Sequence, residues 1–294
     1  MPLLDIVLGY DCNLGCTYCT ITDEMRRRAL PAERVAREID RAALRGFREV
    51  AFTGGEPTIR PDLPALVKHA RRRGFEHVKV ASNGLRYAHA PYLEHLVTCG
   101  VDRFHMSMHA PGDAAYEIVV RREGTAALRR QAIANLVARG LDPVADLILK
   151  EDTHRDVRGW IEGLHALGVR RFALWLVSLT DQNAANVAQL PRLTEVAPSL
   201  AGAFDDARRG GYEVVSLHVP RCFLPGHEDH VQHPGASLVT VVTPDDVFDL
   251  ADSRLGGGVK PAGCQGCRWA DACPGLRHDY VAVFGGDEVR AVVG

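Results

Sequence analysis

Short apolar segments alternate with longer helical patterns from residue 3 to about residue 180. The predicted strands are 3–8, 48–53, 76–82, 102–109, 143–149 and 171–177. The predicted helices lie near 31–46, 62–74, 90–99, 125–140 and 153–168. Strict alternation of strand and helix is typical of right-handed βαβ units in a parallel sheet. The chain therefore predicts an α/β fold, and six such units make a partial (β/α)6 barrel of the TIM type.

Polar residues occupy alternate positions in two of these strands. In the fourth strand, His105, Ser107 and His109 share one face, because side chains alternate with a period of two. In the fifth strand the same period places Asp146 and Lys150 on one face. A charge inside an apolar strand is costly unless it is paired or functional. Asp146 and Lys150 are therefore candidate catalytic residues in the barrel lumen, with a structural salt bridge as the alternative. The two histidines are either polar filler of the barrel mouth or substrate contacts.

The pattern changes towards the C-terminus. Residues 181–210 predict a helical connector, and the part that follows is rich in Gly and Pro, with short strands at Glu213 to Val219 and Leu238 to Val242. Four of the eight cysteines also lie there. The predicted domains are 1–205, the partial barrel, and 206–294, a small C-terminal domain.

Composition narrows the class of protein. The 294 residues are 46% hydrophobic and 24% charged, with a net charge of -2, so no basic excess indicates a nucleic-acid partner. The N-terminus lacks the features of a secretion signal, and no apolar run reaches membrane-spanning length. We therefore expect a cytoplasmic protein without a membrane partner. Seven cysteines fall into two metal-like groups, which favours reduced thiols that bind iron over disulfides.

The first group follows the first predicted strand directly. Cys12, Cys16 and Cys19 have C-x3-C-x2-C spacing. A [4Fe-4S] cluster normally takes four cysteines, so this loop would leave one iron without a protein ligand. Structural zinc prefers four closed ligands and fits three cysteines poorly. The loop therefore predicts an iron-sulfur cluster with an open iron, where chemistry can occur.

Further motifs occur in order after this loop. The segment Thr53 to Pro57 reads TGGEP after the second strand, Ser82 to Gly84 reads SNG at the end of the third, and Ser107 lies on the fourth. In this order the chain resembles the radical S-adenosylmethionine (radical SAM) superfamily over roughly residues 3 to 180. The resemblance implies that the open iron binds SAM, and that one-electron reduction yields methionine and a 5'-deoxyadenosyl radical that abstracts a substrate hydrogen. It also implies an electron donor such as flavodoxin or ferredoxin.

The resemblance assigns cofactor contacts to the GGEP motif. Gly54 and Gly55 would let the backbone approach the methionine amino group, which residues with a Cβ cannot do. Glu56 and Pro57 would fix the geometry of the strand end. Cys12, Cys16 and Cys19 would bind the reactive cluster.

Other implied SAM contacts lie on the cysteine loop and at later strand ends. Tyr18 would border the adenine, and Ser82 with Asn83 and Ser107 would contact the ribose or the methionine carboxylate. Arg121, or its neighbour Arg122, would pair with that carboxylate through a guanidinium fork. Ordinary loop capping is the alternative for the serine and arginine residues.

The second cysteine group resembles the C-terminal SPASM/Twitch extension of radical SAM enzymes. Cys264, Cys267 and Cys273 have C-x2-C-x5-C spacing, and Cys222 lies upstream. The longer SPASM form has a further cysteine where this chain has Arg277, so the resemblance favours the Twitch type. It implies one auxiliary [4Fe-4S] cluster with four cysteine ligands, which would carry electrons rather than bind substrate. The alternative is a zinc site that only stabilises the domain.

The motifs together predict an oxidative radical SAM enzyme of a biosynthetic pathway. The reaction would be a dehydrogenation or the formation of a C-C, C-S or C-O bond in a small molecule or a peptide. A ribosomal-peptide maturase would need a separate recognition protein, because the first strand begins at residue 3. A molybdenum-cofactor-type cyclase is disfavoured by the C-terminal cysteine spacing and by the ending Val292-Val293-Gly294. A non-catalytic iron-sulfur sensor or electron carrier would not need the GGEP motif. The oligomeric state is left open.

Overall fold

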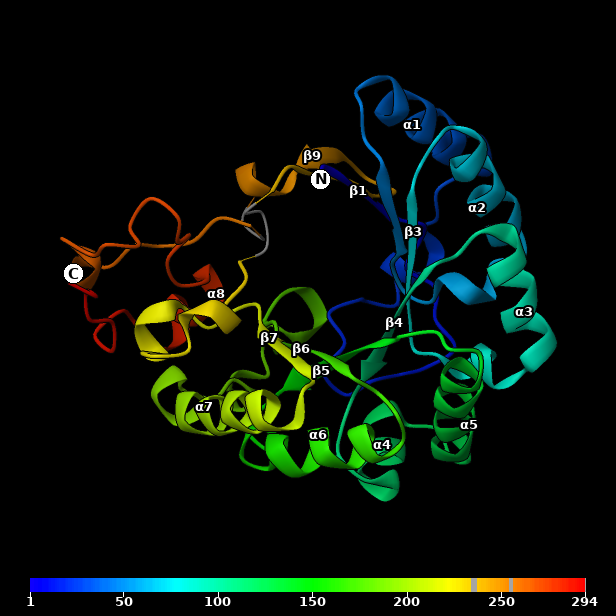
Figure 1. Cartoon of the computed structure of the whole chain (residues 1–294). Helices are drawn as coiled ribbons and strands as arrows, with labels where there is room; N and C mark the ends of the chain where they lie inside the picture. Colours follow the sequence, from blue (N-terminus) through cyan, green and yellow to red (C-terminus); the bar gives the residue numbers. More distant parts are fainter. Residues whose placement is uncertain (234–236, 254–255, 294) are drawn as a thin grey trace.

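The computed structural model describes residues 1–233, 237–253 and 256–293. Its strands form one sheet in the order β7-β6-β5-β4-β3-β2-β1-β8-β9. In the described part of the chain, neighbouring strands from β7 to β8 are parallel, and β9 runs antiparallel to β8. The order does not close on itself, so the predicted partial α/β barrel is confirmed (Figure 1).

The described part of the chain alternates strand and helix much as the sequence predicts. The strands are β1 (Leu3–Val7), β2 (Glu49–Thr53), β3 (His77–Ser82), β4 (Arg103–Met108), β5 (Val144–Leu149), β6 (Arg171–Leu176), β7 (Glu213–Ser216), β8 (Val239–Val242) and β9 (Val247–Asp249). The helices are α1 (Ala32–Leu44), α2 (Leu63–Arg72), α3 (Ala90–Cys99), α4 (Asp113–Val120), α5 (Thr125–Ala138), α6 (Val157–Ala166), α7 (Leu193–Gly210) and α8 (His278–Phe284). The elements α4, α8 and β9 were not predicted from the sequence. Helix α7 begins at Leu193, whereas the predicted helical connector began at residue 181.

Hydrophobic periodicity explains how each helix attaches to the sheet. Helix α1 buries Val35, Ile39 and Ala42, which lie three or four residues apart and form one apolar stripe. Strand β4 alternates in the predicted way, with Phe104 and Met106 in the core and the intervening residues half-buried. The helices therefore cover the outer face of the curved sheet, as Figure 1 shows, and the polar strand positions face the lumen.

The C-terminal part contributes to the same sheet. Strand β7 pairs with β6, and β8 pairs with β1, so the sheet grows at both edges of the predicted six-strand core. The predicted boundary between residues 205 and 206 stays a prediction. The last segment, 256–293, lies beside β7 and α7 (Figure 1) and is tied to the barrel by the Tyr280 hydroxyl, which accepts from the Leu193 amide at 2.9 Å.

Membrane-spanning potential can be judged from the described helices. None of them combines the length and the apolar character that a bilayer crossing requires.

Candidate active site

The cysteine loop, residues 9–19, follows β1 at the carboxyl end of the sheet. Its backbone is anchored on α4, because the Gly15 amide donates to Val120 O at 3.2 Å and the Thr17 amide to Val119 O at 2.9 Å. Leu14 packs in a small apolar cluster that includes Val120, and Cys12 and Cys16 lie against that cluster. The helix that the sequence reasoning missed is thus a support of the three-cysteine loop.

The two glycines of the GGEP motif lie directly against this loop. A Cβ on Gly55 would lie 2.2 Å from Asp11 O, and one on Gly54 would lie 2.3 Å from Gly9 O. Gly54 also has a φ of 128°, a backbone angle that residues with a side chain rarely adopt. The Gly55 amide donates to Gly9 O at 2.9 Å. The glycines therefore allow two backbones to touch, which is a further reason for them besides the predicted approach to SAM.

Glu56 is a buried carboxylate that protein donors surround. It accepts hydrogen bonds from the Thr58 amide at 2.9 Å, from the Thr58 hydroxyl, from the Ser82 hydroxyl at 2.7 Å and from the Asn83 amide at 2.7 Å. Burial raises the pKa of Glu56, and these donors act against that rise. Glu56 joins the end of β2 to the end of β3, and Pro57 begins the short 3-10 turn Pro57–Ile59 that follows.

A cavity of about 300 Å³ opens at this end of the barrel, between the cysteine loop and the strand ends. Its lining residues are Cys12, Leu14, Cys16, Tyr18, Cys19, Thr20, Ile21, Thr53, Gly54, Gly55, Ala81, Ser82, Asn83, Ser107, His109, Ile148 and Ser178. The structure thus gathers nine of the predicted cluster and SAM residues around one space. Glu56, Pro57 and Arg121 do not line it, and neither do Asp146 and Lys150.

The chemistry of the three thiols fits a metal cluster. Burial, together with the neighbouring sulfurs of Cys19 and Cys12, raises the pKa of Cys16 to about 12. Burial also raises the pKa of Cys12. Three sulfurs that face one another in a partly buried site cannot all ionise without a compensating cation. An iron-sulfur cluster supplies that positive charge, so the residues present suit the group.

Tyr18 and His109 both line the cavity and contact each other. The Tyr18 hydroxyl is hydrogen-bonded to Nδ1 of His109, and Cys16 Sγ lies 3.9 Å from the same nitrogen. Burial, together with the charges of Arg129 and Lys150, lowers the pKa of His109 to about 3. His109 is therefore a neutral imidazole at neutral pH, and it orients the predicted adenine neighbour Tyr18.

Asp146 and Lys150 do not form the salt bridge that was the structural alternative. Among the described residues, Asp146 instead contacts His105, whose Nδ1 lies 3.1 Å from Oδ2, and accepts from Trp175 Nε1 at 3.0 Å. Lys150 Nζ lies 2.9 Å from a carboxylate oxygen of Asp152. The sequence pattern could not identify these partners, because His105 and Trp175 lie on neighbouring strands and Asp152 lies in the following loop.

Arg121 ends α4 with a left-handed backbone, at a φ of 55°. Its side chain runs towards Gly15 of the cysteine loop, where the Arg121 Cδ lies 4.0 Å from the position of an added Cβ. The next residue, Arg122, donates to Asn13 O at 2.9 Å. Arg26 donates to the carbonyls of Cys12 and Leu14, each at 3.1 Å. Three arginines therefore surround the loop. Among the described residues, Arg26 and Arg122 donate to backbone carbonyls of the loop, and Arg121 does not.

The four C-terminal cysteines converge as well. Cys222 lies on a 3-10 turn, Arg221–Phe223, and lines one pocket together with Cys264, Cys267 and Cys273. Burial, together with the other three sulfurs, raises the pKa of Cys222 to about 11. The donor set again requires a cation, and four sulfurs suit a cluster whose irons are all ligated or a zinc ion.

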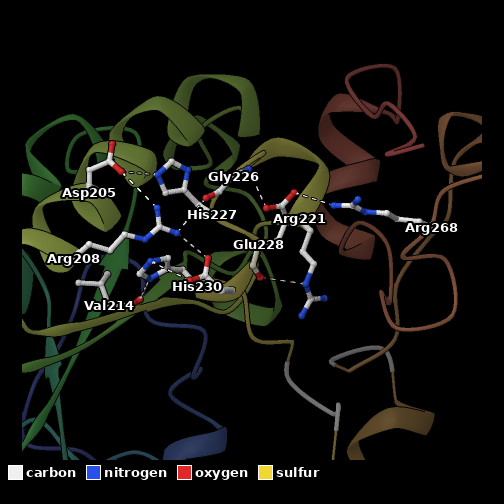
Figure 2. Close-up of polar contacts among 10 residues, drawn as sticks. Asp205, Arg208, Val214, Arg221, Gly226, His227, Glu228, His230 and Arg268 are labelled. Carbon is white, nitrogen blue, oxygen red and sulfur yellow. Dashed lines mark hydrogen bonds and ion pairs between the residues drawn. The ribbon is translucent and has the colours of Figure 1, made fainter. Parts of the chain in front are cut away.

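Polar contacts hold the Cys222 segment against the C-terminal segment. Figure 2 shows Arg221 reaching the carbonyl of Glu228, at 3.3 Å, while the Glu228 carboxylate meets Arg268 at 3.4 Å. The guanidinium groups of Arg221 and Arg268 lie 4.9 and 5.2 Å from the ring centroid of Trp269. The two halves of the cysteine pocket are thereby joined through these side chains.

Several residues in or beside the cavity were not predicted from the sequence. Ile148 lines the cavity and shares the face of Asp146, so the period of two could have identified it. Ser178 follows β6 and carries no motif. Asn13 accepts from the Asn83 side chain at 2.7 Å, a contact between residues 70 apart for which the sequence gives no signal.

Comparison with known proteins agrees with this geometry. A PqqA peptide cyclase of Ruegeria pomeroyi is 26% identical over 208 residues, which are 69% of this chain and 55% of that protein. A probable GTP 3',8-cyclase of Methanopyrus kandleri is 31% identical over 155 residues, 52% of this chain and 49% of that protein. The chain thus spans about half the length of these curated relatives.

Among solved structures, SuiB of Streptococcus suis bound to S-adenosylmethionine has a TM-score of 0.71 at 12% identity, over 99% of this chain and 76% of SuiB. At that identity the likeness concerns the fold alone. The sequence model of the radical SAM superfamily matches residues 6–162, which is more than half of the chain. The chain belongs to the radical SAM superfamily, whose enzymes use a [4Fe-4S] cluster and S-adenosylmethionine.

Proposed function

We propose that this enzyme carries out an oxidative modification of a peptide, with SAM bound at the three-cysteine loop and an auxiliary [4Fe-4S] cluster at the C-terminal pocket. The observation that carries the proposal is the convergence of four cysteines in the second pocket, in addition to the three that line the cavity. A second cluster whose irons all have cysteine ligands is suited to electron transfer, because it leaves no iron open to substrate.

The proposed reaction removes two electrons from the substrate. Cys12, Cys16 and Cys19 would hold the cluster that binds SAM, and the one-electron reduction of SAM would supply the chemistry that removes one hydrogen atom from the substrate and releases 5'-deoxyadenosine. The remaining substrate radical reaches a closed-shell product when it loses one electron and one proton. An auxiliary cluster held by the four C-terminal cysteines would accept the electron, and Asp146 with His105 would take the proton. Asp146 suits this role because it lies in the lumen two residues before Ile148, which lines the cavity.

Other residues of the cavity would position SAM. Ser107 and Asn83 line the space, and Asn83 is held by its contact with Asn13. Tyr18, fixed by His109, would border the adenine. Arg121 would turn towards the methionine carboxylate, because it is the arginine beside the loop whose guanidinium has no backbone acceptor there among the described hydrogen bonds. Gly54 and Gly55 would present backbone to the methionine amino group while they also support the loop.

The peptide substrate is supported by the relatives that cover most of the chain. The PqqA peptide cyclase match spans 69% of this chain, against 52% for the GTP 3',8-cyclase. SuiB, which was also solved with its precursor peptide SuiA, matches over 99% of this chain and so includes the C-terminal part. A small polar molecule is the second candidate, and the ionisable lumen favours it, because Asp146, His105 and Lys150 could each bind a polar substrate group.

Two sets of cysteine variants test the proposal. Anaerobically reconstituted protein should hold about eight irons and eight sulfides, as two cubes require. Replacing Cys12, Cys16 and Cys19 with Ala should halve the iron and abolish the formation of 5'-deoxyadenosine. Replacing Cys264 and Cys267 with Ala should halve the iron, leave SAM cleavage largely intact and eliminate the oxidised product. Cys99→Ala is the matched control, because Cys99 belongs to neither group and is buried in the core.

The outcomes separate the parts of the proposal. One tightly bound zinc with only four irons would contradict the auxiliary cluster. A folded double variant that still makes full product would contradict an oxidative role of that cluster. Transfer of deuterium from labelled peptides or small molecules into 5'-deoxyadenosine would identify the substrate class, and a deuterated small molecule as the only active donor would contradict the peptide.

A further inference from the structure

Two glutamates and a histidine come together outside the active site, where the loop after β5 meets the start of α7. Glu151 follows Lys150, His154 begins the 3-10 turn His154–Asp156, and Glu195 lies in the first turn of α7. One possible ligand atom from each residue lies within 4.8 Å of the other two. His154 Nε2 is 3.9 Å from Glu151 Oε2, which is longer than a hydrogen bond.

His154 is the feature that requires an explanation. Its side chain is only 1% exposed, and within the residues that the structure describes neither ring nitrogen has a hydrogen-bond partner. A buried polar group without a partner costs about 1–3 kcal/mol, so such groups are rare in folded proteins. Burial, together with the nearby Arg155, lowers the pKa of His154, which leaves the neutral imidazole that metals bind. One ring nitrogen of His154 lies within 4.8 Å of a carboxylate oxygen of each glutamate.

From these contacts we infer that Glu151, His154 and Glu195 form a binding site for a divalent transition-metal ion, of which Zn²⁺ fits best. One imidazole nitrogen and two carboxylate oxygens are a donor set that zinc accepts, with a fourth position for water. This inference does not rest on the proposed function, because none of the three residues lines the SAM cavity.

The flexibility of the site allows the contraction that zinc needs. Bonds of 2.0–2.2 Å place tetrahedral ligands about 3.4 Å apart, so the carboxylates must move inward by roughly 1 Å. The side chains of Glu151 and Glu195 are 39% and 47% exposed and can rotate. Arg155 holds Oε1 of Glu151 at 2.8 Å and Oε2 of Glu195 at 3.3 Å. It therefore leaves the second oxygen of each carboxylate for the ion.

The place of the site gives the ion a structural consequence. The amides of Thr153 and His154 both donate to Lys150 O at 3.0 Å, so a ligand that holds His154 also orders the loop directly after Lys150. The Glu151 amide donates to Gln189 O at 2.9 Å. An ion shared with Glu195 would join this loop to α7 and would fix the backbone that carries the lumen residue Lys150.

Zinc binding by the cluster-loaded protein tests the inference. The reconstituted protein is dialysed against Zn²⁺, and zinc, iron and sulfide are measured per chain. Wild-type protein should retain one zinc more than His154→Gln or Glu195→Gln, with equal iron and sulfide in all three. Glu162→Gln, which changes an exposed carboxylate on α6, is the matched control and should retain the wild-type zinc. Each ligand variant should weaken zinc binding at least about 100-fold, because even the loss of an indirect partner costs 10–100-fold.

Two further readouts keep the test decisive. Arg155→Gln should tighten zinc binding roughly tenfold, because it removes a positive charge that competes for both carboxylates. Zinc should slow hydrogen exchange of the amides at 151–157 in the wild type and not in Glu195→Gln. Glu195 is exposed, so that variant carries the test if His154→Gln does not fold. Equal zinc in wild type and Glu195→Gln, or hydrogen exchange that zinc leaves unchanged, would overturn the inference.

Discussion

Gly55→Ala should detach the cysteine loop from the sheet and remove the SAM-binding cluster. The new Cβ would lie 2.2 Å from Asp11 O and 2.4 Å from Tyr10 O, and both are backbone atoms that cannot rotate away. An ordinary contact requires the loop to retreat by about 1 Å. That movement weakens two hydrogen bonds, from the Gly55 amide to Gly9 O and from the Glu56 amide to Asp11 O. About 1 kcal/mol for each bond and about 1–3 kcal/mol for overpacking give a loss of about 3–5 kcal/mol.

The assay is the iron and sulfide content of anaerobically reconstituted protein, measured with 5'-deoxyadenosine formation. Gly55→Ala should lower iron from about eight to about four per chain, because only the auxiliary cluster remains. Gly163→Ala is the matched control, since no atom lies within 4 Å of the added methyl and the change should stabilise α6 by up to about 1 kcal/mol. Full iron with normal SAM cleavage would refute the reasoning. Full iron with lost SAM cleavage would also refute it, because Gly55 would then act on SAM and not on the loop.

Two other predictions concern Asp146 and His218. Asp146→Asn keeps an acceptor for Trp175 but cannot take a proton, so product formation should fall about 100-fold or more while uncoupled SAM cleavage is kept, and equal loss of both activities would indicate a structural role. Burial, with a smaller effect of Arg277, lowers the pKa of His218 to about 3. Because the unfolded chain binds this proton near pH 6.5 and the folded chain does not, stability should fall as the pH drops below 6.5. Urea unfolding should therefore show His218→Asn losing about 2 kcal/mol less than wild type between pH 7 and pH 5, and equal losses would contradict the assignment.

The elements that the sequence predicted are those with local signals. The period of two placed His105, Ser107 and Asp146 on lumen faces, and strand-helix alternation placed the motifs at the carboxyl end of the sheet. The contacts that support the cysteine loop could not be predicted in the same way. Gly15 is anchored on Val120, more than a hundred residues later, and no periodicity records such a pair.

Strand pairing shows the same limit. The prediction that residues 238–242 form a strand is confirmed by β8, but its position beside β1 depends on pairing Leu3 with Val239. Hydrophobic patterns specify which face of a strand is buried, but they do not specify which strand lies beside it. The alternative of a salt bridge between Asp146 and Lys150 was wrong for a related reason, because Trp175 reaches Asp146 from the adjacent strand at a register that only the folded sheet defines.

Trp175 connects the lumen with the C-terminal segment. Its indole N-H donates to Asp146, and its ring meets His218 edge to face, with centroids 5.2 Å apart and an interplanar angle of 78°. His218 Nδ1 lies 3.2 Å from a guanidinium nitrogen of Arg277. Burial holds His218 neutral at neutral pH, so the imidazole can accept from the arginine without repulsion. A packed chain of side chains therefore runs from the proposed proton acceptor to the segment that carries the last three cysteines.

Arg277, which stands where the longer SPASM form has a further cysteine, attaches the C-terminal segment to the barrel. Its guanidinium donates to Leu176 O at 2.9 Å and to Val177 O at 2.8 Å, at the carboxyl end of β6, and it pairs with Asp279. Asp279 in turn accepts from the Leu179 amide at 2.9 Å, which adds a second anchor on the same loop. A planar group with five fixed donors suits such an arrangement of carbonyl and carboxylate oxygens. Cys273 lies only four residues before Arg277. The contacts that hold Arg277 and Asp279 therefore also set the position of the cysteine pocket relative to the barrel lumen. Electron transfer from a substrate bound in the lumen would require such a fixed position.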